Sequence, residues 1–167
     1  MKKVLDRIWS ENAEKFMSVV HTSQKNVLHP TLSKLINTHK PHNLLDFGCG
    51  DGRILNEIDA QVEMDVYDKN EEMIHLAKHN VGDKIKTIYS DINEIPNDRY
   101  ESVLLSMVLV CIDNEDEYLG VLKKIKLCKT EIGKVYIAIS HPCFNRRCAV
   151  YNCLGRPAYQ QGRNDPI

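Results

Sequence analysis

The sequence lacks an apolar run long enough to cross a membrane, and its first fifteen residues, MKKVLDRIWSENAEK, contain no hydrophobic leader. These absences argue against a membrane protein and against a secreted one. Neither sign of charge is in excess, because 22 Lys and Arg face 23 Asp and Glu, which disfavours general binding to nucleic acid or anionic lipid. With 167 residues, 43% of them hydrophobic, we expect one globular domain in the cytoplasm.

Cysteine pairs with the C-x-x-C spacing of structural zinc sites are also absent. Cys143, Cys148 and Cys153 recur every five residues but include no close pair, so we predict no metal site, with zinc as the alternative. The other cysteines stand in apolar or turn contexts, where cysteine behaves as a small buried hydrophobe. They are Cys49, Cys111 and Cys128. Without a leader sequence, these cysteines indicate a reduced protein.

The most informative stretch is NLLDFGCGDGRIL, from Asn43 to Leu55. An apolar run with strand character stops at the GCGDG string of residues 48–52 and restarts as a helix-forming segment at Arg53. This pattern predicts a strand, a glycine turn and a helix. Glycine at alternate positions lets the backbone bend through positive φ or lie against a ligand, and the start of a helix presents unpaired N–H groups. Such a loop predicts a site for a nucleotide-like small molecule.

The spacing of the third glycine separates two cofactor classes. The dinucleotide fingerprint G-x-G-x-x-G ends where this chain has Arg53, whereas the third glycine here is Gly52, so a dinucleotide is the weaker alternative. The string from Asp46 to Gly52 instead resembles the first motif of class I S-adenosylmethionine-dependent methyltransferases, an acid followed by G-x-G-x-G. In that family the loop packs against the amino acid portion of the cofactor. The resemblance therefore implies S-adenosylmethionine as cofactor, bound by Asp46, Gly48, Cys49 and Gly50.

A carboxylate follows the next expected strand, Gln61 to Tyr67, about twenty residues past the glycines. At the carboxyl end of a neighbouring strand, Asp68 is placed to accept hydrogen bonds from both ribose hydroxyls of a nucleoside. A compatible alternative is that Asp68 caps the helix expected to begin near Asn70. The resemblance extends through this segment and implies that Lys69 and Met73 also belong to the cofactor site.

A third carboxylate follows the strand predicted at residues 84–89. The family resemblance implies that Asp91 binds the adenine amino group and that the backbone of Ile92 reaches a ring nitrogen. Adenine needs such a polar edge because stacking alone does not distinguish bases. The alternative is that Asp91 is an ordinary turn residue.

The apolar run at residues 101–110 predicts a strand buried on both faces. By resemblance to the family, Ser106 and Met107 lie where cofactor and substrate meet. Methyltransferases that modify exocyclic or amide nitrogens of adenine and glutamine carry an Asn/Asp-Pro-Pro-aromatic tetrapeptide at this point. Its absence here disfavours that chemistry.

Strands and helices alternate through the middle of the chain. Helices are expected at 30–38 and 53–58, from Asn70 and from Asp113, and Gly133 releases the chain into a last strand at 134–140. This order predicts an α/β fold: a Rossmann-like, doubly wound, mainly parallel sheet of about five strands, flanked by helices and preceded by a helical segment. Helical spacing places Leu35 and Tyr118 on buried faces. We expect a helical cap at 1–40, a cofactor-binding core at 41–140 and an irregular tail at 141–167.

Both ends of the chain supply the expected acceptor site. Apolar spacing predicts an amphipathic helix over residues 3–20. The resemblance implies that Trp9 and His29 contact the substrate, although the helix could equally do no more than cover the sheet. The HPCFN segment resembles one that lines the acceptor site in many small-molecule methyltransferases, which implies a substrate contact by Phe144. His141 is the candidate general base for a hydroxyl acceptor, and His29 is its rival.

The two strands that normally follow the fifth strand in this family are not found in residues 141–167. Without them the fifth strand is an exposed edge that invites pairing with another chain. We expect methyl transfer to an oxygen or nitrogen of a small-molecule acceptor, with S-adenosylhomocysteine as product and no membrane partner. The alternatives are a cofactor-binding module that needs a partner chain, or forms a homodimer, through the fifth strand, and, less favoured, an RNA methyltransferase.

Overall fold

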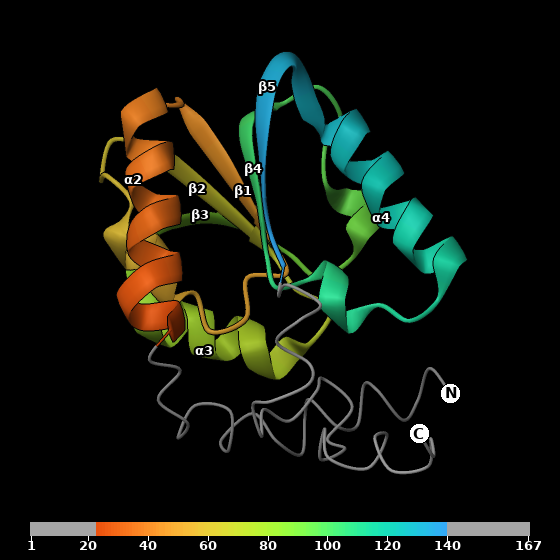
Figure 1. The fold of residues 1–167 in the computed structure, drawn as a ribbon, viewed down its shortest axis with the longest axis horizontal. Helices are drawn as coiled ribbons and strands as arrows, with labels where there is room; N and C mark the ends of the chain where they lie inside the picture. Colours follow the sequence, from red (N-terminus) through yellow and green to blue (C-terminus); the bar gives the residue numbers. More distant parts are fainter. Residues whose placement is uncertain (1–22, 140–167) are drawn as a thin grey trace, which may run out of the picture.

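The computed structural model describes residues 23–139, which form a five-stranded sheet with helices on both faces (Figure 1). The strands are β1 (Asn43–Phe47), β2 (Glu63–Tyr67), β3 (Ile85–Tyr89), β4 (Tyr100–Ser106) and β5 (Lys129–Ala138). All neighbouring pairs are parallel, in the order β3-β2-β1-β4-β5. The first strand, β1, lies in the centre of the sheet. β2 and β3 follow on one side of it, and β4 and β5 are added on the other side, so the strand order reverses between β1 and β4. The predicted doubly wound fold is confirmed.

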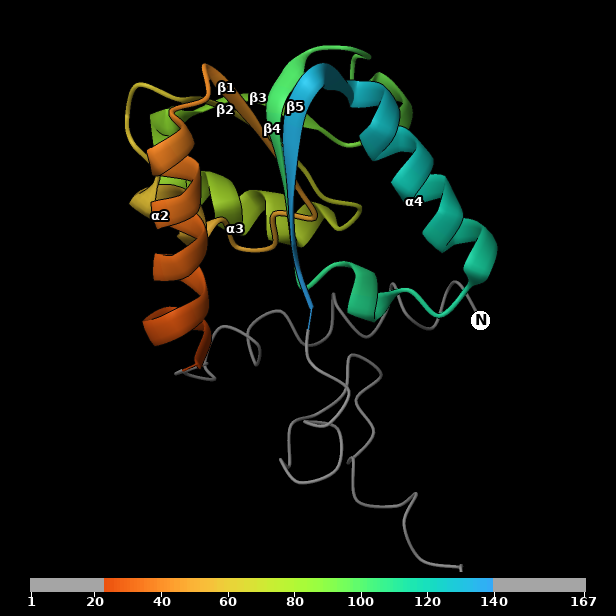
Figure 2. The same cartoon turned by 45° about the horizontal axis from the view of Figure 1, so that its top comes forward.

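Side chains from alternate strand positions build a separate core on each face of the sheet. The helices α2 (His29–His39) and α3 (Glu71–Val81) cover one face, and α4 (Glu115–Cys128) covers the other, as Figures 1 and 2 show. The alternation is clear in β1, where Leu44 belongs to the α2–α3 core and Leu45 to the α4 core. Burial on both faces explains why the central strand β4 contains a continuous apolar run, Val103 to Leu105.

The helices begin and end at residues with suitable local chemistry. Asn70 caps α3 by accepting a hydrogen bond from the Glu72 N–H, and Asn114 caps α4 by accepting one from Glu117. Acids in the first turn of both helices complement the helix dipole. Short turns complete the described elements: the π turn η1 (Gln24–Leu28) and the 3₁₀ turns η2 (Arg53–Glu57), η3 (Gly82–Lys84), η4 (Ile92–Glu94) and η5 (Leu109–Cys111).

Several predicted boundaries are wrong, each for a local reason. The strand predicted at 101–110 ends at Ser106, because Met107 adopts a φ of 62° and the chain turns into η5. The last strand starts at Lys129, so Gly133 lies inside it. A Cβ on Gly133 would lie 2.7 Å from the Tyr100 carbonyl oxygen, close to the shift in β4–β5 register. Glycine there permits close strand pairing and does not release the chain.

Two side chains expected on buried helix faces are exposed: Leu35 is 45% exposed and Tyr118 is 36% exposed. The buried side of α2 is centred instead on Leu32 and Ile36. Each helix therefore buries a narrower stripe than its apolar spacing suggests. The helix predicted at 3–20 lies outside the described residues, and none of the helices within 23–139 is long and apolar enough to cross a membrane.

Candidate functional site

The carboxyl ends of the central strands meet at one edge of the sheet, where the strand order reverses between β1 and β4. The glycine loop that follows β1 lies at this edge, at the lower side of the sheet in Figure 1. The residues predicted to hold the cofactor lie at the carboxyl ends of β1 to β4 or just after them. In open parallel sheets, ligands bind at such an edge.

The loop after β1 is a compact turn built on glycine. The N–H groups of Gly48 and Cys49 both donate to the Tyr67 carbonyl oxygen, at 2.7 and 3.1 Å, which joins the loop to the end of β2. A Cβ on Gly48 would lie 2.5 Å from Val108 Cγ2, so this glycine permits close packing. Gly50 differs, because its φ is +54° and no described atom lies within 4 Å of the position of a Cβ. The backbone at Gly50 is therefore open to a ligand.

Asp68 links this loop to the start of α3. Its Oδ2 accepts a hydrogen bond from the Gly50 N–H and its Oδ1 accepts one from the Asn70 N–H, each at 2.9 Å. Burial raises the pKa of the Asp68 carboxyl, while these backbone hydrogen bonds act in the opposite direction. The capping role predicted as an alternative for Asp68 belongs to Asn70, two residues further on, which is the N-cap of α3. A carboxylate oxygen has two lone pairs, so each oxygen of Asp68 can still accept a hydroxyl.

Asp46, near the end of β1, is buried without compensation. It is 1% exposed, and its Oδ2 has no hydrogen-bond partner within the described part of the chain. Burial, together with the negative charges of Asp68 and Asp51, raises the pKa of Asp46 to about 7. An unpaired carboxylate in such a place is unfavourable for folding and is typical of a functional site. It would favour a positively charged ligand.

Asp91 and Ile92 begin the segment that follows β3. Asp91 Oδ1 accepts hydrogen bonds from the backbone and side-chain N–H groups of Asn93, both at 2.9 Å, and Glu94 completes a capping box around η4. The turn role predicted as an alternative for Asp91 is therefore present. The Asp91 side chain is also exposed, and Ile92 packs partly against the α4 core.

Tyr67, which was not selected from the sequence, lies among these groups. Its ring centroid is 4.7 Å from that of Phe47. Burial raises the pKa of Tyr67 to about 12, and the charges of Asp68, Asp91 and Glu117 add to the effect. The sequence did carry a signal, because Tyr67 ends β2 directly before Asp68. Its ring packs against Phe47 and the α4 core.

The remaining predicted cofactor residues occupy different positions at this edge. Lys69 Nζ lies 3.5 Å from an acid in the first turn of α4, and Met73 is buried in α3. Ser106 ends β4. Met107 has a positive φ, which is uncommon for a residue with a Cβ, and its N–H donates to the Ala138 carbonyl at 2.8 Å. Such backbone strain clusters at functional sites.

Of the residues predicted for the acceptor site, His29 lies in the described part of the chain, whereas Trp9, His141 and Phe144 lie outside it. His29 is partly buried at the start of α2. Burial lowers the pKa of His29, against the opposing effect of the nearby Glu57 and Asp51 charges. The imidazole is therefore mostly neutral near pH 7, as a proton acceptor must be.

Within residues 23–139, no three His, Cys, Asp or Glu side chains are grouped closely enough to hold a metal ion. A surface hollow lined in part by Lys40, His42 and Glu101 lies at the amino ends of the strands. This is the opposite edge of the sheet from the glycine loop, so the hollow is separate from the candidate site.

Residues 44–128 match a family model described as a methyltransferase domain. The matched segment contains the glycine loop, Asp68 and Asp91, and therefore the whole edge described above apart from His29. Among proteins with curated descriptions, none matches the sequence.

Solved structures share the fold at low sequence identity. A structure described as a DhpI–SAM–HEP complex has a TM-score of 0.69 and 13% identity, over 84% of this chain and 66% of that chain. The 1,6-didemethyltoxoflavin-N1-methyltransferase of Burkholderia thailandensis has a TM-score of 0.59 and 18% identity, over 80% and 60%. A protein from Pyrococcus horikoshii has a TM-score of 0.56 and 23% identity, over 69% and 56%. These likenesses show the fold, and this chain spans less than two thirds of the length of each of these three.

Proposed function

The chain belongs to the methyltransferase domain family, and we propose that it transfers the methyl group of S-adenosylmethionine to an oxygen or nitrogen of a small-molecule acceptor. The observation that carries the proposal is the buried Asp46 carboxylate, whose Oδ2 has no partner among residues 23–139, at the same edge as the open backbone of Gly50. The solved relatives support it, because the DhpI structures are described with SAM and SAH. The Burkholderia protein is described as an N1-methyltransferase of a small molecule.

The residues at the edge suit the methionyl and ribose parts of this cofactor. The Asp46 carboxylate supplies a hydrogen-bond acceptor for the positively charged methionyl end. The glycine loop supplies open backbone at Gly50, where no side chain blocks the cofactor. Asp68 retains lone pairs for the ribose hydroxyls. The residues proposed to hold the cofactor are Asp46, Gly48, Cys49, Gly50, Asp68, Lys69, Met73, Asp91, Ile92, Ser106 and Met107.

When bound, S-adenosylmethionine supplies a methyl group already activated by its sulfonium for in-line displacement. The chain then has to position the acceptor, and holding two reacting groups near contact distance can contribute several kcal/mol without a covalent catalyst. A hydroxyl acceptor must also lose its proton. His141 is the proposed base, with His29 as the rival because its lowered pKa leaves it neutral near pH 7. Trp9, His29 and Phe144 are the proposed substrate contacts.

The exposed edge of β5 favours a second candidate function, a cofactor-binding module that works only with a partner chain. Among the described residues β5 is the outermost strand on its side of the sheet, and Ile137 on it is 48% exposed. Such an edge can pair with a second copy or another chain. A strictly monomeric species in light scattering at high concentration would argue against this arrangement. In either case we propose a cytoplasmic protein with a cap at 1–40, a core at 41–140 and a tail at 141–167.

Isothermal titration calorimetry with S-adenosylhomocysteine tests the proposal. We expect the parent protein to bind it, and Asp68→Ala to weaken binding about ten- to a hundredfold. A hydrogen bond to a charged group contributes about 1.5–3 kcal/mol, and about 1.4 kcal/mol is a factor of ten. Asp83→Ala removes an exposed acid from η3 and should leave the affinity unchanged. A parent protein that binds NAD but not S-adenosylhomocysteine would refute the proposal.

A further inference from the structure

Asp65, in the middle of β2, is a buried carboxylate that the candidate site does not use. It is 2% exposed, and its neighbours across the sheet are Leu45 in β1 and, beyond it, Val103 in β4. Both neighbours belong to the apolar core beneath α4. Because burying a carboxylate is unfavourable and an apolar side chain suits this core, the charge at Asp65 needs an explanation.

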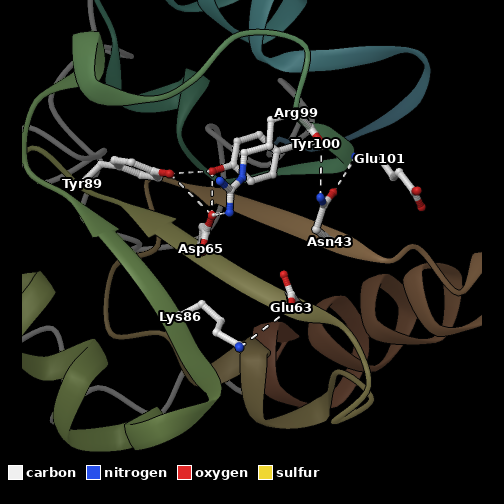
Figure 3. Close-up of polar contacts among 8 residues, drawn as sticks. All are labelled: Asn43, Glu63, Asp65, Lys86, Tyr89, Arg99, Tyr100 and Glu101. Atoms are coloured by element: carbon white, nitrogen blue, oxygen red, sulfur yellow. Dashed lines mark hydrogen bonds and ion pairs between the residues drawn. The ribbon is translucent and has the colours of Figure 1, made fainter.

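Three side chains converge on one oxygen of Asp65 (Figure 3). The Tyr100 hydroxyl donates to Asp65 Oδ2 at 2.8 Å, and Arg99 Nη2 lies 3.1 Å from the same oxygen. The Tyr89 hydroxyl lies 3.0 Å from that of Tyr100 and 3.5 Å from Asp65 Oδ2. The carboxylate therefore gathers one cation and two phenols.

These partners lie at the two ends of a single segment. Tyr89 ends β3, whereas Tyr100 begins β4 and Arg99 directly precedes it. We name residues 90–99 the β3–β4 connector. Asp65 thus holds the connector at both ends. Only Ser90 separates Tyr89 from the proposed adenine contacts, Asp91 and Ile92.

The β3–β4 connector has little regular structure of its own to fix its shape, since its helical part is the three-residue η4. Its later half is tied to α4. Lys124 Nζ donates to the Ile95 carbonyl at 2.6 Å, and the Asp98 N–H donates to the Leu127 carbonyl at 2.8 Å. Asn43 also binds the backbone on either side of Tyr100, as Figure 3 shows. The earlier half follows Tyr89. The capping box shapes η4 and Ile92 packs partly against the α4 core, while the Asp65 cluster holds the tyrosine from which this half starts.

We propose that Asp65 is a positioning residue for adenine recognition. By holding Tyr89 and Arg99, it fixes the β3–β4 connector in the conformation that presents Asp91 and Ile92 to the adenine amino group and ring nitrogen. Asp65 itself does not touch the cofactor. The inference rests on the proposed function, because it presupposes a cofactor with an adenine base. It accounts for a charge in an apolar core whose partners come from both ends of one segment.

The test compares the binding of S-adenosylhomocysteine with that of S-inosylhomocysteine, whose base carries an oxygen in place of the adenine amino group. We expect the parent to prefer the adenosine ligand about tenfold, because the oxygen would face the Asp91 carboxylate. In Asp65→Asn, the preference should fall to about twofold or less, and S-adenosylhomocysteine should bind roughly five- to tenfold more weakly. A purely structural role would weaken both ligands alike and leave their ratio unchanged.

Two further variants make the result decisive. Tyr89→Phe keeps the ring and removes only the hydroxyl, so it should fold and show the same loss of preference, to a smaller extent. Glu63→Gln breaks the exposed Glu63–Lys86 pair, 3.8 Å long, on the same two strands, and should leave the preference unchanged (Figure 3). An unchanged preference in the folded variants, or a parent with no preference, overturns this inference alone. A parent that does not bind S-adenosylhomocysteine overturns the proposed function as well.

Discussion

Asp46 and Asp65 are buried carboxylates on adjacent strands with opposite surroundings. They are one register step apart, because Asp65 pairs with Leu45 and Asp46 pairs with Val66. Successive strand residues face opposite sides of a sheet, so Asp65 lies on the α4 face and Asp46 on the α2–α3 face. Asp65 has a guanidinium and phenol hydroxyls at its Oδ2. Asp46 Oδ2 has no partner in the part of the chain that the structure describes, and the charge of Asp68 is nearby.

The difference separates two reasons for burying a charge. Asp65 also has an oxygen, Oδ1, without a partner among the described residues, so the contrast lies in the cation and the donors at Oδ2. A carboxylate with such partners is compensated by the fold itself. Asp46 is not, and it therefore lowers the stability of the protein without ligand. A group of this kind is retained where a ligand supplies the missing partner.

The largest expected effect is the gain in stability when Asp46 becomes Asn. The pKa of Asp46 rises from its ordinary value of 3.8 to about 7 in the folded protein. Between these values the folded state binds more protons than the unfolded state, so stability falls as pH rises through this window. Near pH 8 the full penalty is present, and Asp46→Asn should raise the free energy of unfolding by about 2–4 kcal/mol. Urea unfolding should show this gain near pH 8 and almost none near pH 4.

The same variant separates stability from binding. If the Asp46 charge is retained for the cofactor, Asp46→Asn should bind S-adenosylmethionine more weakly although it is more stable. A variant that is more stable and binds S-adenosylmethionine equally well would show that the Asp46 charge does not contribute to cofactor binding. A variant that loses stability near pH 8 would show that Asp46 is compensated, and the contrast with Asp65 would disappear.

A smaller effect of opposite sign is expected on the other face of the sheet. Tyr100 is fully buried, and Tyr100→Phe removes the hydroxyl that donates to Asp65 at 2.8 Å. Losing a hydrogen bond to a buried charge should lower the free energy of unfolding by about 1.5–3 kcal/mol. Tyr118→Phe is the matched control, because Tyr118 is 36% exposed on α4, and this variant should lose less than about 1 kcal/mol. Equal losses of unfolding free energy in the two variants would mean that the hydrogen bond from Tyr100 does not stabilise the Asp65 carboxylate.

The two carboxylates also differ in how far the sequence predicted them. Asp46 and Asp68 belong to local patterns: Asp68 was selected because an acid follows the next strand at the right spacing, and Asp46 because an acid before alternate glycines resembles the family's first motif. Asp65 could not, because its partners Tyr89 and Tyr100 are 24 and 35 positions away. Strand register and the path of the β3–β4 connector bring these three residues together. Neither feature can be predicted from a short stretch of sequence.

Strand ends were predicted less well than the succession of strands and helices along the chain, for the same reason. Val108 and Leu109 are apolar like the residues of β4, but Val108 is in contact distance of Gly48 and Leu109 starts η5. Their burial comes from the glycine loop and the α4 core and not from the sheet. Apolar character therefore indicates that a residue is covered, whereas the element that covers it depends on tertiary contacts.

The smallest expected effect sharpens the comparison from outside the core. Glu63 lies on β2, two positions before Asp65, and its pair with Lys86 leaves the two side chains 42% and 63% exposed. Water already solvates both charges, so Glu63→Gln should change the free energy of unfolding by less than about 0.5 kcal/mol, and by less still at high salt. Urea unfolding at low and high salt, beside Tyr100→Phe, measures both. Suppose that Glu63→Gln lowers the free energy of unfolding as much as Tyr100→Phe does. Position on β2 and not burial would then set the effect of a charge on stability. The different partners of Asp46 and Asp65 would no longer explain why the two carboxylates differ.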